Sequence, residues 1–259
     1  MEYIKKGNGD YLVLVHGALT DGSMWIPHIE YLESHFEVIS VTLSHFEKPE
    51  ECGFGLNTHA DELAELVRKL LASKSVYIVG WSYGADVVLN MLAKEDVAVS
   101  KVFLYEPGYP GCVKENDMGV WAADASAMFG KVFEHFSNDN LELVVELLID
   151  GSGNRLGYFQ SQNKDVKNLQ LSKAYTLASQ LNQQEQPVIN AQNISNIKVP
   201  ISFGYGLESR AIFRLATVSS AESSEISTLV GIEGEAHMFP QESPKKFSNY
   251  IKEIIGNKG

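Results

Sequence analysis

Cysteine is scarce in this chain, and its scarcity excludes several kinds of site. Among 259 residues only Cys52 and Cys112 are cysteines, and they form no C-x-x-C pair. Two isolated cysteines provide neither a disulfide framework nor a thiolate metal site. The sequence also lacks a His, Asp or Glu cluster with metal-ligand spacing, and its glycine-rich stretches lack the strand-to-helix context of a dinucleotide or phosphate loop. We therefore expect no metal and no cofactor.

Positive charge is also in short supply. The chain has 21 Lys and Arg against 33 Asp and Glu, a net charge of −12. Nucleic acid and anionic membranes repel such a chain, so neither is expected as a partner. No apolar signal core is visible near the start, and no run reaches membrane-spanning length. These features predict a cytoplasmic protein.

Short β-branched or aliphatic runs alternate with amphipathic segments along the chain. The runs cover residues 11–15, 36–42, 75–80, 101–106, 199–205 and 226–232. They lack strict apolar–polar alternation, which is typical of parallel strands covered on both faces. Between them, residues 58–71 have a helical period of leucines, with Thr58 as the predicted N-terminal cap. The alternation predicts one doubly wound α/β domain with a mostly parallel sheet.

The alternation stops after Pro107. Residues 110–198 contain no convincing strand but several apolar stripes with helical spacing. We therefore predict a helical lid, residues 110–198, inserted before the last two strands of a core formed by residues 1–109 and 199–259. Helices with apolar faces over the strand ends would shield a pocket for an apolar ligand.

A G-x-S-x-G motif, Gly80 to Gly84, lies between a predicted strand and a predicted helix. In that context the motif is typical of a nucleophile elbow, because the glycines permit a tight turn that exposes Ser82. The alternative is an ordinary turn with a capping serine. A second strand ends at His16-Gly17, and the next backbone N–H, that of Ala18, would pair with the N–H of Tyr83 as an oxyanion hole.

These segments carry a family resemblance. With "HGALTDGSMW", "GWSYGA", "GEAHMFPQESPKKF" and the helical insertion, the chain resembles the α/β-hydrolase fold superfamily over nearly its whole length. The resemblance implies that His16 is structural and that His237, between the last strand and the final helix, is the catalytic base. His45 is placed at the pocket edge at most. The N-terminus departs from the pattern, because only "EYIKK" precedes the first core strand where members often have a two-strand hairpin.

The acid of the predicted triad is the least obvious member. A carboxylate must hold the far nitrogen of the imidazole. In the superfamily it most often follows the strand after the lid, but Ser209 stands where an Asp is expected and Glu208 lies one residue too early. In some branches it follows the strand before the lid. Glu106 ends the apolar run "VFLY" there, on a strand expected between the Ser82 strand and the 199–205 strand.

A buried carboxylate is costly unless it is paired, which favours Glu106 as the acid. The sequence therefore resembles the branch with a Ser-Glu-His triad found in zearalenone-type lactonases. A cap or a salt bridge to the lid is the other explanation of Glu106, and Glu208 is the alternative acid. Trp25, Trp81 and Tyr109 flank the predicted site and either wall an acyl pocket or belong to the core. Asp86 is either a buried partner for lid or loop groups or a residue at a solvated helix position, and we predict the solvated position.

These residues predict a serine hydrolase that cleaves a carboxylic ester or lactone through an acyl-enzyme. The expected substrate is a small, uncharged, apolar ester. A carbon–carbon bond hydrolase or a hydroxynitrile-lyase-like enzyme would use the same triad, and a non-catalytic member would keep the pocket only to bind a ligand. The sequence indicates neither the natural substrate nor the oligomeric state.

Overall fold

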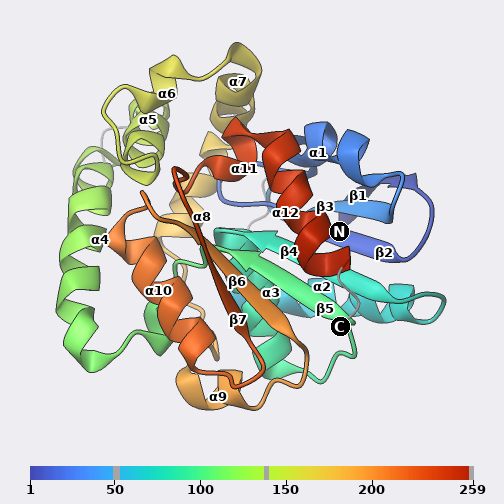
Figure 1. The fold of residues 1–259 in the computed structure, drawn as a ribbon. Helices are drawn as coiled ribbons and strands as arrows, with labels where there is room; N and C mark the ends of the chain where they lie inside the picture. The colour runs from blue at the N-terminus through green and yellow to red at the C-terminus, as the bar shows by residue number, and fades with distance from the viewer. Residues whose placement is uncertain (49–52, 137–139, 257–259) are drawn as a thin grey trace.

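The computed structural model describes residues 1–48, 53–136 and 140–256, so Cys52 lies outside the described residues. Within them, a sheet of seven strands has the order β1-β3-β2-β4-β5-β6-β7 (Figure 1). The strands are β1 (Glu2–Gly7), β2 (Tyr11–Val15), β3 (Glu37–Thr42), β4 (Val76–Trp81), β5 (Lys101–Tyr105), β6 (Ile201–Gly206) and β7 (Thr228–Ile232). All neighbouring pairs are parallel except β1 and β3, which are antiparallel. This confirms the predicted α/β class with a mostly parallel sheet.

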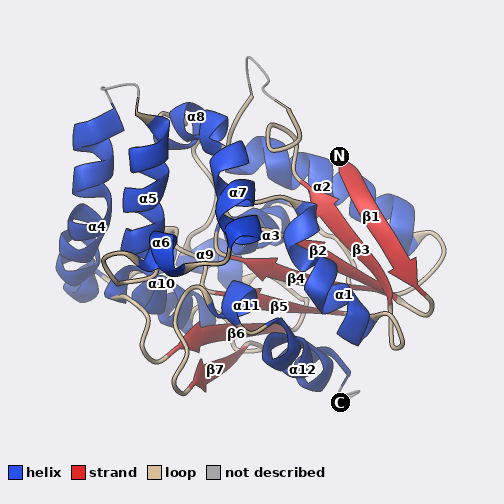
Figure 2. Ribbon diagram, turned by 90° about the horizontal axis from the view of Figure 1, so that it is seen from above, coloured by secondary structure: helices blue, strands red, loops and turns tan. Residues whose placement is uncertain are grey.

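Helices cover both faces of the sheet at its centre, which explains why strands β2 to β6 are mostly buried, whereas the edge strands β1 and β7 are mostly exposed. The helices of the core are α1 (Ile26–Leu32), α2 (Leu56–Leu71), α3 (Tyr83–Lys94), α10 (Ala211–Glu222), α11 (Phe239–Glu242) and α12 (Pro244–Gly256). Helices α1 and α12 pack together against one face, and α2 and α3 pack together against the other (Figure 2). All five residues of β2 are buried, as expected for a strand covered on both faces.

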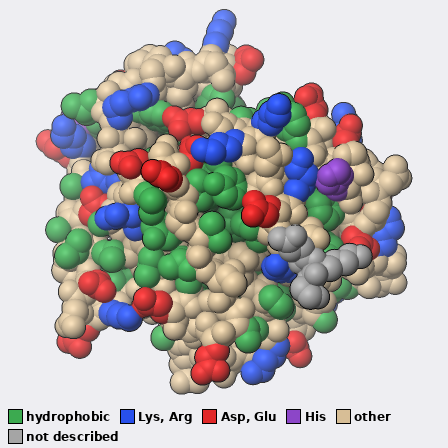
Figure 3. Space-filling model, viewed as in Figure 1, with side chains coloured by type: hydrophobic (Ala, Val, Ile, Leu, Met, Phe, Trp, Pro, Cys, Tyr) green, Lys and Arg blue, Asp and Glu red, His purple; other side chains and the backbone are tan. Residues whose placement is uncertain are grey.

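A helical insertion connects β5 to β6, and no strand occurs among its described residues. Its elements are η2 (Pro110–Cys112), α4 (Glu115–Phe136), α5 (Leu141–Ser152), α6 (Tyr158–Ser161), α7 (Lys164–Ser172), η3 (Ala174–Thr176), α8 (Leu177–Leu181) and α9 (Ala191–Ser195). Helices α4 to α8 lie beyond one end of the sheet, whereas α9 returns to pack against α3 (Figures 1 and 2). On the face in Figure 3, hydrophobic side chains gather over α4 and α10, and the charged side chains of both signs are scattered among them.

The predicted cap of the second helix is wrong. Helix α2 begins at Leu56, two residues before the predicted start, and its N-cap Gly55 has no side chain to cap it. The backbone N–H groups of Asn57 and Thr58 instead donate to a carboxylate oxygen of Glu185, at 2.6 and 3.1 Å. Glu185 belongs to the insertion, so a distant side chain supplies the acceptor that a local hydroxyl was expected to provide.

Candidate active site

A strained turn joins β4 to α3 and carries Ser82. Its backbone has φ 54° and ψ −124°, a conformation that residues with a side chain rarely adopt. The flanking glycines are required by close contacts: a Cβ on Gly80 would lie 2.8 Å from the Cα of Ala85, and one on Gly84 would lie 2.4 Å from the carbonyl oxygen of His16. The turn therefore has the geometry expected of a nucleophile elbow.

His237 lies between Ser82 and Glu106. Its Nε2 is 3.0 Å from the Ser82 Oγ, and its Nδ1 is 2.7 Å from Oε2 of Glu106. Both His237 and Glu106 are buried. An ionised carboxylate can only accept, so the imidazole proton sits on Nδ1 and Nε2 accepts from the serine hydroxyl. This is the order of groups that a general base needs to take a proton from a nucleophilic serine.

Glu106 is held from the neighbouring strand. Strand β5 lies between β4 and β6, as predicted, and the Oε1 of Glu106 accepts from the backbone N–H of Gly206 at 2.7 Å. The hydroxyl of Ser209 donates to the same oxygen. The position where an Asp was expected thus supplies a donor to a carboxylate on the adjacent strand. Glu208 is exposed, and the structure places Glu106 rather than Glu208 against His237.

Three aromatic side chains fix the position of His237. The ring of Phe213, from α10, stacks on the imidazole with centroids 3.6 Å apart and an interplanar angle of 5°. The indole N–H of Trp81 donates to the carbonyl of His237 at 3.0 Å, and the Tyr105 hydroxyl donates to the carbonyl of Ala236 at 2.8 Å. Sequence reasoning missed Phe213 and Tyr105, because no local pattern distinguishes them from core residues.

The loop after β2 forms the other side of the site. His16 is fully buried; its Nε2 accepts from the backbone N–H of Leu43 at 3.1 Å, and its Nδ1 donates to the carbonyl of Gly17 at 2.8 Å. Burial lowers the pKa of His16 to about 4, although the hydrogen bond to Gly17 opposes this. The ring is therefore neutral near pH 7 and serves as a backbone brace. Ala18, after β2, and Tyr83, after β4, line the same cavity as Ser82.

The first residue of α3 has a backbone N–H with no acceptor inside the helix. That residue is Tyr83, so its N–H is available to a ligand oxygen at the elbow. The Tyr83 hydroxyl points elsewhere and lies 2.8 Å from Nδ1 of His59. His59 in turn lies 3.0 Å from Nδ1 of His45. The prediction of His45 at the pocket edge is wrong: it is buried behind His59 and does not line the cavity.

A cavity of about 300 Å³ opens in front of Ser82. Its apolar lining comes from both the core and the insertion, and includes Leu19, Tyr109, Trp121, Phe129, Leu148 and Leu177. Two of the three aromatic residues singled out from the sequence, Trp81 and Tyr109, line it. Trp25 does not, because its side chain is fully buried in the core between His28 and Phe247.

The cavity also contains polar atoms that find no partner in the described part of the chain. Gln170 of α7 is fully buried and lines the cavity, and its Oε1 has no hydrogen-bond partner there. The indole N–H of Trp121, from α4, is buried and unpartnered in the same way. An unpaired buried polar group costs free energy, so both atoms are available to polar groups of a ligand.

Asp86 corrects another prediction. It was expected on a solvated face of α3, but it is buried and lines the cavity. Its two carboxylate oxygens accept from the backbone N–H groups of Gly108 and Tyr109, both at 3.1 Å. Burial raises the pKa of Asp86 to about 7, and these two hydrogen bonds oppose the rise. Asp86 therefore ties α3 to the start of the insertion.

Within residues 1–48, 53–136 and 140–256, no three His, Cys, Asp or Glu side chains are arranged to hold a metal ion. In the same residues no helix has both the length and the apolar character that crossing a bilayer requires.

The chain resembles known proteins in sequence. A model of the alpha/beta hydrolase family matches residues 12–249. A pimeloyl-[acyl-carrier protein] methyl ester esterase of Vibrio vulnificus strain CMCP6 is 30% identical over 166 residues, which cover 63% of this chain and 60% of that protein. The same-named esterase of Vibrio atlanticus is 36% identical over 98 residues, covering 37% of this chain and 36% of that protein. The chain thus spans about 60% or less of the length of these relatives.

Solved structures share the fold. MenH from S. aureus superimposes with a TM-score of 0.76 at 20% identity, covering 98% of this chain and 97% of that one. Est816, described as an N-acyl homoserine lactone degrading enzyme, has a TM-score of 0.74 at 16% identity, with coverage of 98% and 96%. At such identities the likeness concerns the fold. Together with the family match over residues 12–249, it shows that the chain belongs to the alpha/beta hydrolase family.

Proposed function

We propose that the protein is a serine hydrolase that cleaves a carboxylic ester or lactone through an acyl-enzyme. The observation that carries this proposal is the row of Ser82, His237 and Glu106, joined at 3.0 and 2.7 Å, at one wall of the apolar cavity. A serine on a strained elbow with an aligned base has no use in a protein that only binds a ligand. The esterase relatives and the lactone-degrading structural neighbour belong to the same reaction class.

In the proposed reaction His237 takes the proton of Ser82 as the hydroxyl attacks the ester carbonyl. The backbone N–H groups of Ala18 and Tyr83 stabilise the oxyanion. His237 then protonates the leaving alkoxide, and an acyl-enzyme remains on Ser82. Glu106 fixes the tautomer of the neutral imidazole and stabilises the imidazolium that forms when His237 holds the extra proton. A water molecule, deprotonated by His237, attacks the acyl group and releases the acid.

The helical insertion acts in this proposal as a lid over an apolar acyl or aryl group. Its helices α4, α5, α7 and α8 contribute side chains to the cavity. Among the described residues no Lys or Arg belongs to the lining, which leaves an anionic substrate without a counter-charge. We therefore assign a small, uncharged and mostly apolar ester or lactone as the substrate.

Labelling by a fluorophosphonate tests the nucleophile. The parent protein and the control Ser34→Ala, which changes an exposed serine, should label, whereas Ser82→Ala should not. Turnover of p-nitrophenyl esters and of simple lactones should fall by several orders of magnitude in Ser82→Ala. Labelling that survives in a folded Ser82→Ala protein would refute the assignment.

The same set of assays separates the rival activities. Cyanide release from a cyanohydrin, without ester turnover, would indicate a lyase. Labelling at Ser82 with no turnover of esters, lactones or cyanohydrins would point to carbon–carbon bond hydrolysis. A parent protein that neither labels nor turns over any of these substrates would be a non-catalytic member.

A further inference from the structure

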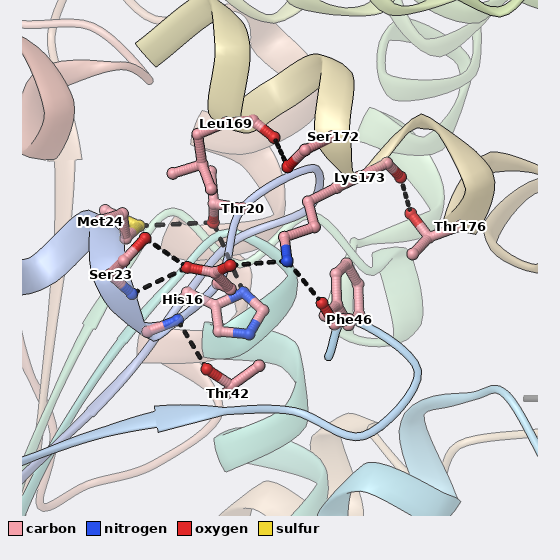
Figure 4. Close-up of polar contacts among 12 residues, drawn as sticks. His16, Thr20, Ser23, Met24, Thr42, Phe46, Leu169, Ser172, Lys173 and Thr176 are labelled. Atoms are coloured by element: carbon pink, nitrogen blue, oxygen red, sulfur yellow. Dashed lines mark hydrogen bonds and ion pairs between the residues drawn. The ribbon is translucent and has the colours of Figure 1, made fainter. Parts of the chain in front are cut away.

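A partly buried ion pair links the insertion to the loop that carries Ala18. Lys173 follows the last residue of α7, and Figure 4 shows its side chain reaching down past Thr20 to Phe46. Its Nζ lies 2.6 Å from Oδ2 of Asp21 and donates to the carbonyl of Phe46 at 2.8 Å. The side chains of Lys173 and Asp21 are only 11% and 17% exposed. Little solvent screens this pair, so removing either charge would leave the other without compensation.

Asp21 is the last residue of the loop 16–21, and its other carboxylate oxygen is also held. Its Oδ1 accepts from the backbone N–H of Ser23 at 2.8 Å and from the Ser23 hydroxyl. The neighbouring hydroxyl of Thr20 donates to the carbonyl of Gly17 at 2.8 Å. Burial alone would raise the pKa of Asp21, but hydrogen bonds from Lys173 and Ser23 outweigh it and lower the pKa. Asp21 is therefore ionised at neutral pH and fastened at both oxygens.

The loop needs such a restraint because its backbone is strained. Leu19, next to Ala18, has φ 54°, which costs a residue with a side chain roughly 1–3 kcal/mol. A strained loop keeps its conformation only when its surroundings determine it. His16 braces the start of this loop, and Lys173 with Asp21 braces its end. The donor Ala18 lies between the two braces.

Residues on both sides of Lys173 belong to the wall of the cavity, although Lys173 itself does not. Gln170, three residues before it, and Leu177, four residues after it, both line the cavity in front of Ser82. One side chain therefore joins the part of the insertion that contacts the substrate to the loop that would stabilise the oxyanion.

We propose that Lys173 is a positioning residue for the reaction. Its ion pair with Asp21 holds the Ala18 N–H where the oxyanion forms and fixes α7 against the same loop. This inference rests on the proposed hydrolase function, in which Ala18 has that task. Lys173 does not touch the reacting atoms and acts only through the position of the Ala18 N–H. Because that N–H binds the oxyanion, the loss of Lys173 should lower kcat and leave KM nearly unchanged.

The test compares Lys173→Met, Lys173→Arg and the control Lys164→Met, which changes an exposed lysine at the other end of α7. Loss of one oxyanion donor costs about 100- to 1000-fold in kcat, and a misplaced donor less, so we expect Lys173→Met to lose roughly 10- to 100-fold. KM should stay within about threefold, and affinity for a trifluoromethyl ketone, which forms a tetrahedral adduct on the serine, should fall in parallel with kcat. Lys173→Arg and Lys164→Met should remain near the parent.

Asp21→Asn gives a second route to the same result, and it applies also if Lys173→Met does not fold. The double variant should lose no more than the worse single variant, because the two residues act as one unit. Unchanged kcat and ketone affinity in a folded Lys173→Met or Asp21→Asn protein would overturn the inference, and so would a change confined to KM or to melting temperature. A parent protein with no hydrolase activity would instead refute the proposed function.

Discussion

Replacing Glu106 by Gln separates the two candidate acids, because the change keeps the size of the side chain and removes only its charge. The buried Oε1 would still accept from Gly206 and Ser209. The amide nitrogen would then face Nδ1 of His237, now 2.7 Å from a carboxylate oxygen. An amide N–H must meet an acceptor there, so the imidazole proton moves to Nε2 and the ring can no longer accept from Ser82.

The size of the loss follows from that tautomer change. Amide replacement of the triad acid in serine proteases costs up to about 10,000-fold in kcat, and we expect Glu106→Gln to lose roughly 1,000- to 10,000-fold. Glu208→Gln is the matched control, since it makes the same change on an exposed loop, and should stay within about twofold. Steady-state turnover of a p-nitrophenyl ester measures both, after thermal melting shows that both proteins fold.

A crippled Glu208→Gln beside a nearly normal Glu106→Gln would refute the assignment of Glu106. If neither variant loses activity, the imidazole is oriented by another group. The structure offers a further check on the same reasoning: placing the acid on the adjacent loop, in the double variant Glu106→Gln with Ser209→Asp, should recover part of the lost activity. No recovery would mean that Ser209 lies too far from Nδ1 to take over the role.

Three other predictions test the packing around the site. The pKa of Asp86 is about 7 in the folded protein against an ordinary 3.8, so between these values the folded state binds a proton that the unfolded state has lost. The free energy of unfolding should therefore fall as pH rises from about 4 to about 7, by on the order of 4 kcal/mol. Urea melts should show this loss in the parent and not in Asp86→Asn. Gln170→Leu removes a buried acceptor that has no partner among the described residues. The ratio of kcat/KM for plain hydrocarbon acyl chains to kcat/KM for hydroxylated ones should therefore rise by roughly 5- to 100-fold. An unchanged ratio would contradict a ligand-facing role for Gln170. Gly84→Ala should prevent folding or lower Tm by many degrees, because its Cβ would meet backbone oxygens at 2.4 and 2.6 Å, whereas Gly119→Ala, with nothing within 4 Å, should leave Tm equal or higher.

The sequence predicted the sheet well because buried parallel strands have a local signature. The run "YLVLV" matches β2, and the other predicted runs differ from β3 to β7 by one or two residues at their ends, but no predicted run covers the edge strand β1. The elbow at Ser82 was equally visible, because a tight turn between a strand and a helix requires glycines at fixed positions. The order of the strands followed from chain topology, which is why Glu106 could be expected beside the Ser82 strand.

Contacts between distant segments were not predictable in this way. The cap of α2 by Glu185, the burial of Asp86 and the stacking of Phe213 on His237 each depend on how the insertion or α10 packs against the core. Trp25 could not be assigned for the same reason, since its position in the sequence suited both the pocket and the core, and its side chain lies in the core. Periodicity describes which face of an element is apolar, but not which partner covers that face.

The cap that Glu185 provides for α2 affects any attempt to change selectivity by exchanging the insertion. A foreign insertion grafted between β5 and β6 would bring new cavity walls, but it would also delete the carboxylate that accepts from Asn57 and Thr58. The graft would then weaken a core helix far from the grafted junctions, at a cost of about 0.5–2 kcal/mol for a lost cap. A chimera that retains a glutamate at this position, or gains a serine at Gly55, should therefore be more stable than one designed on cavity shape alone.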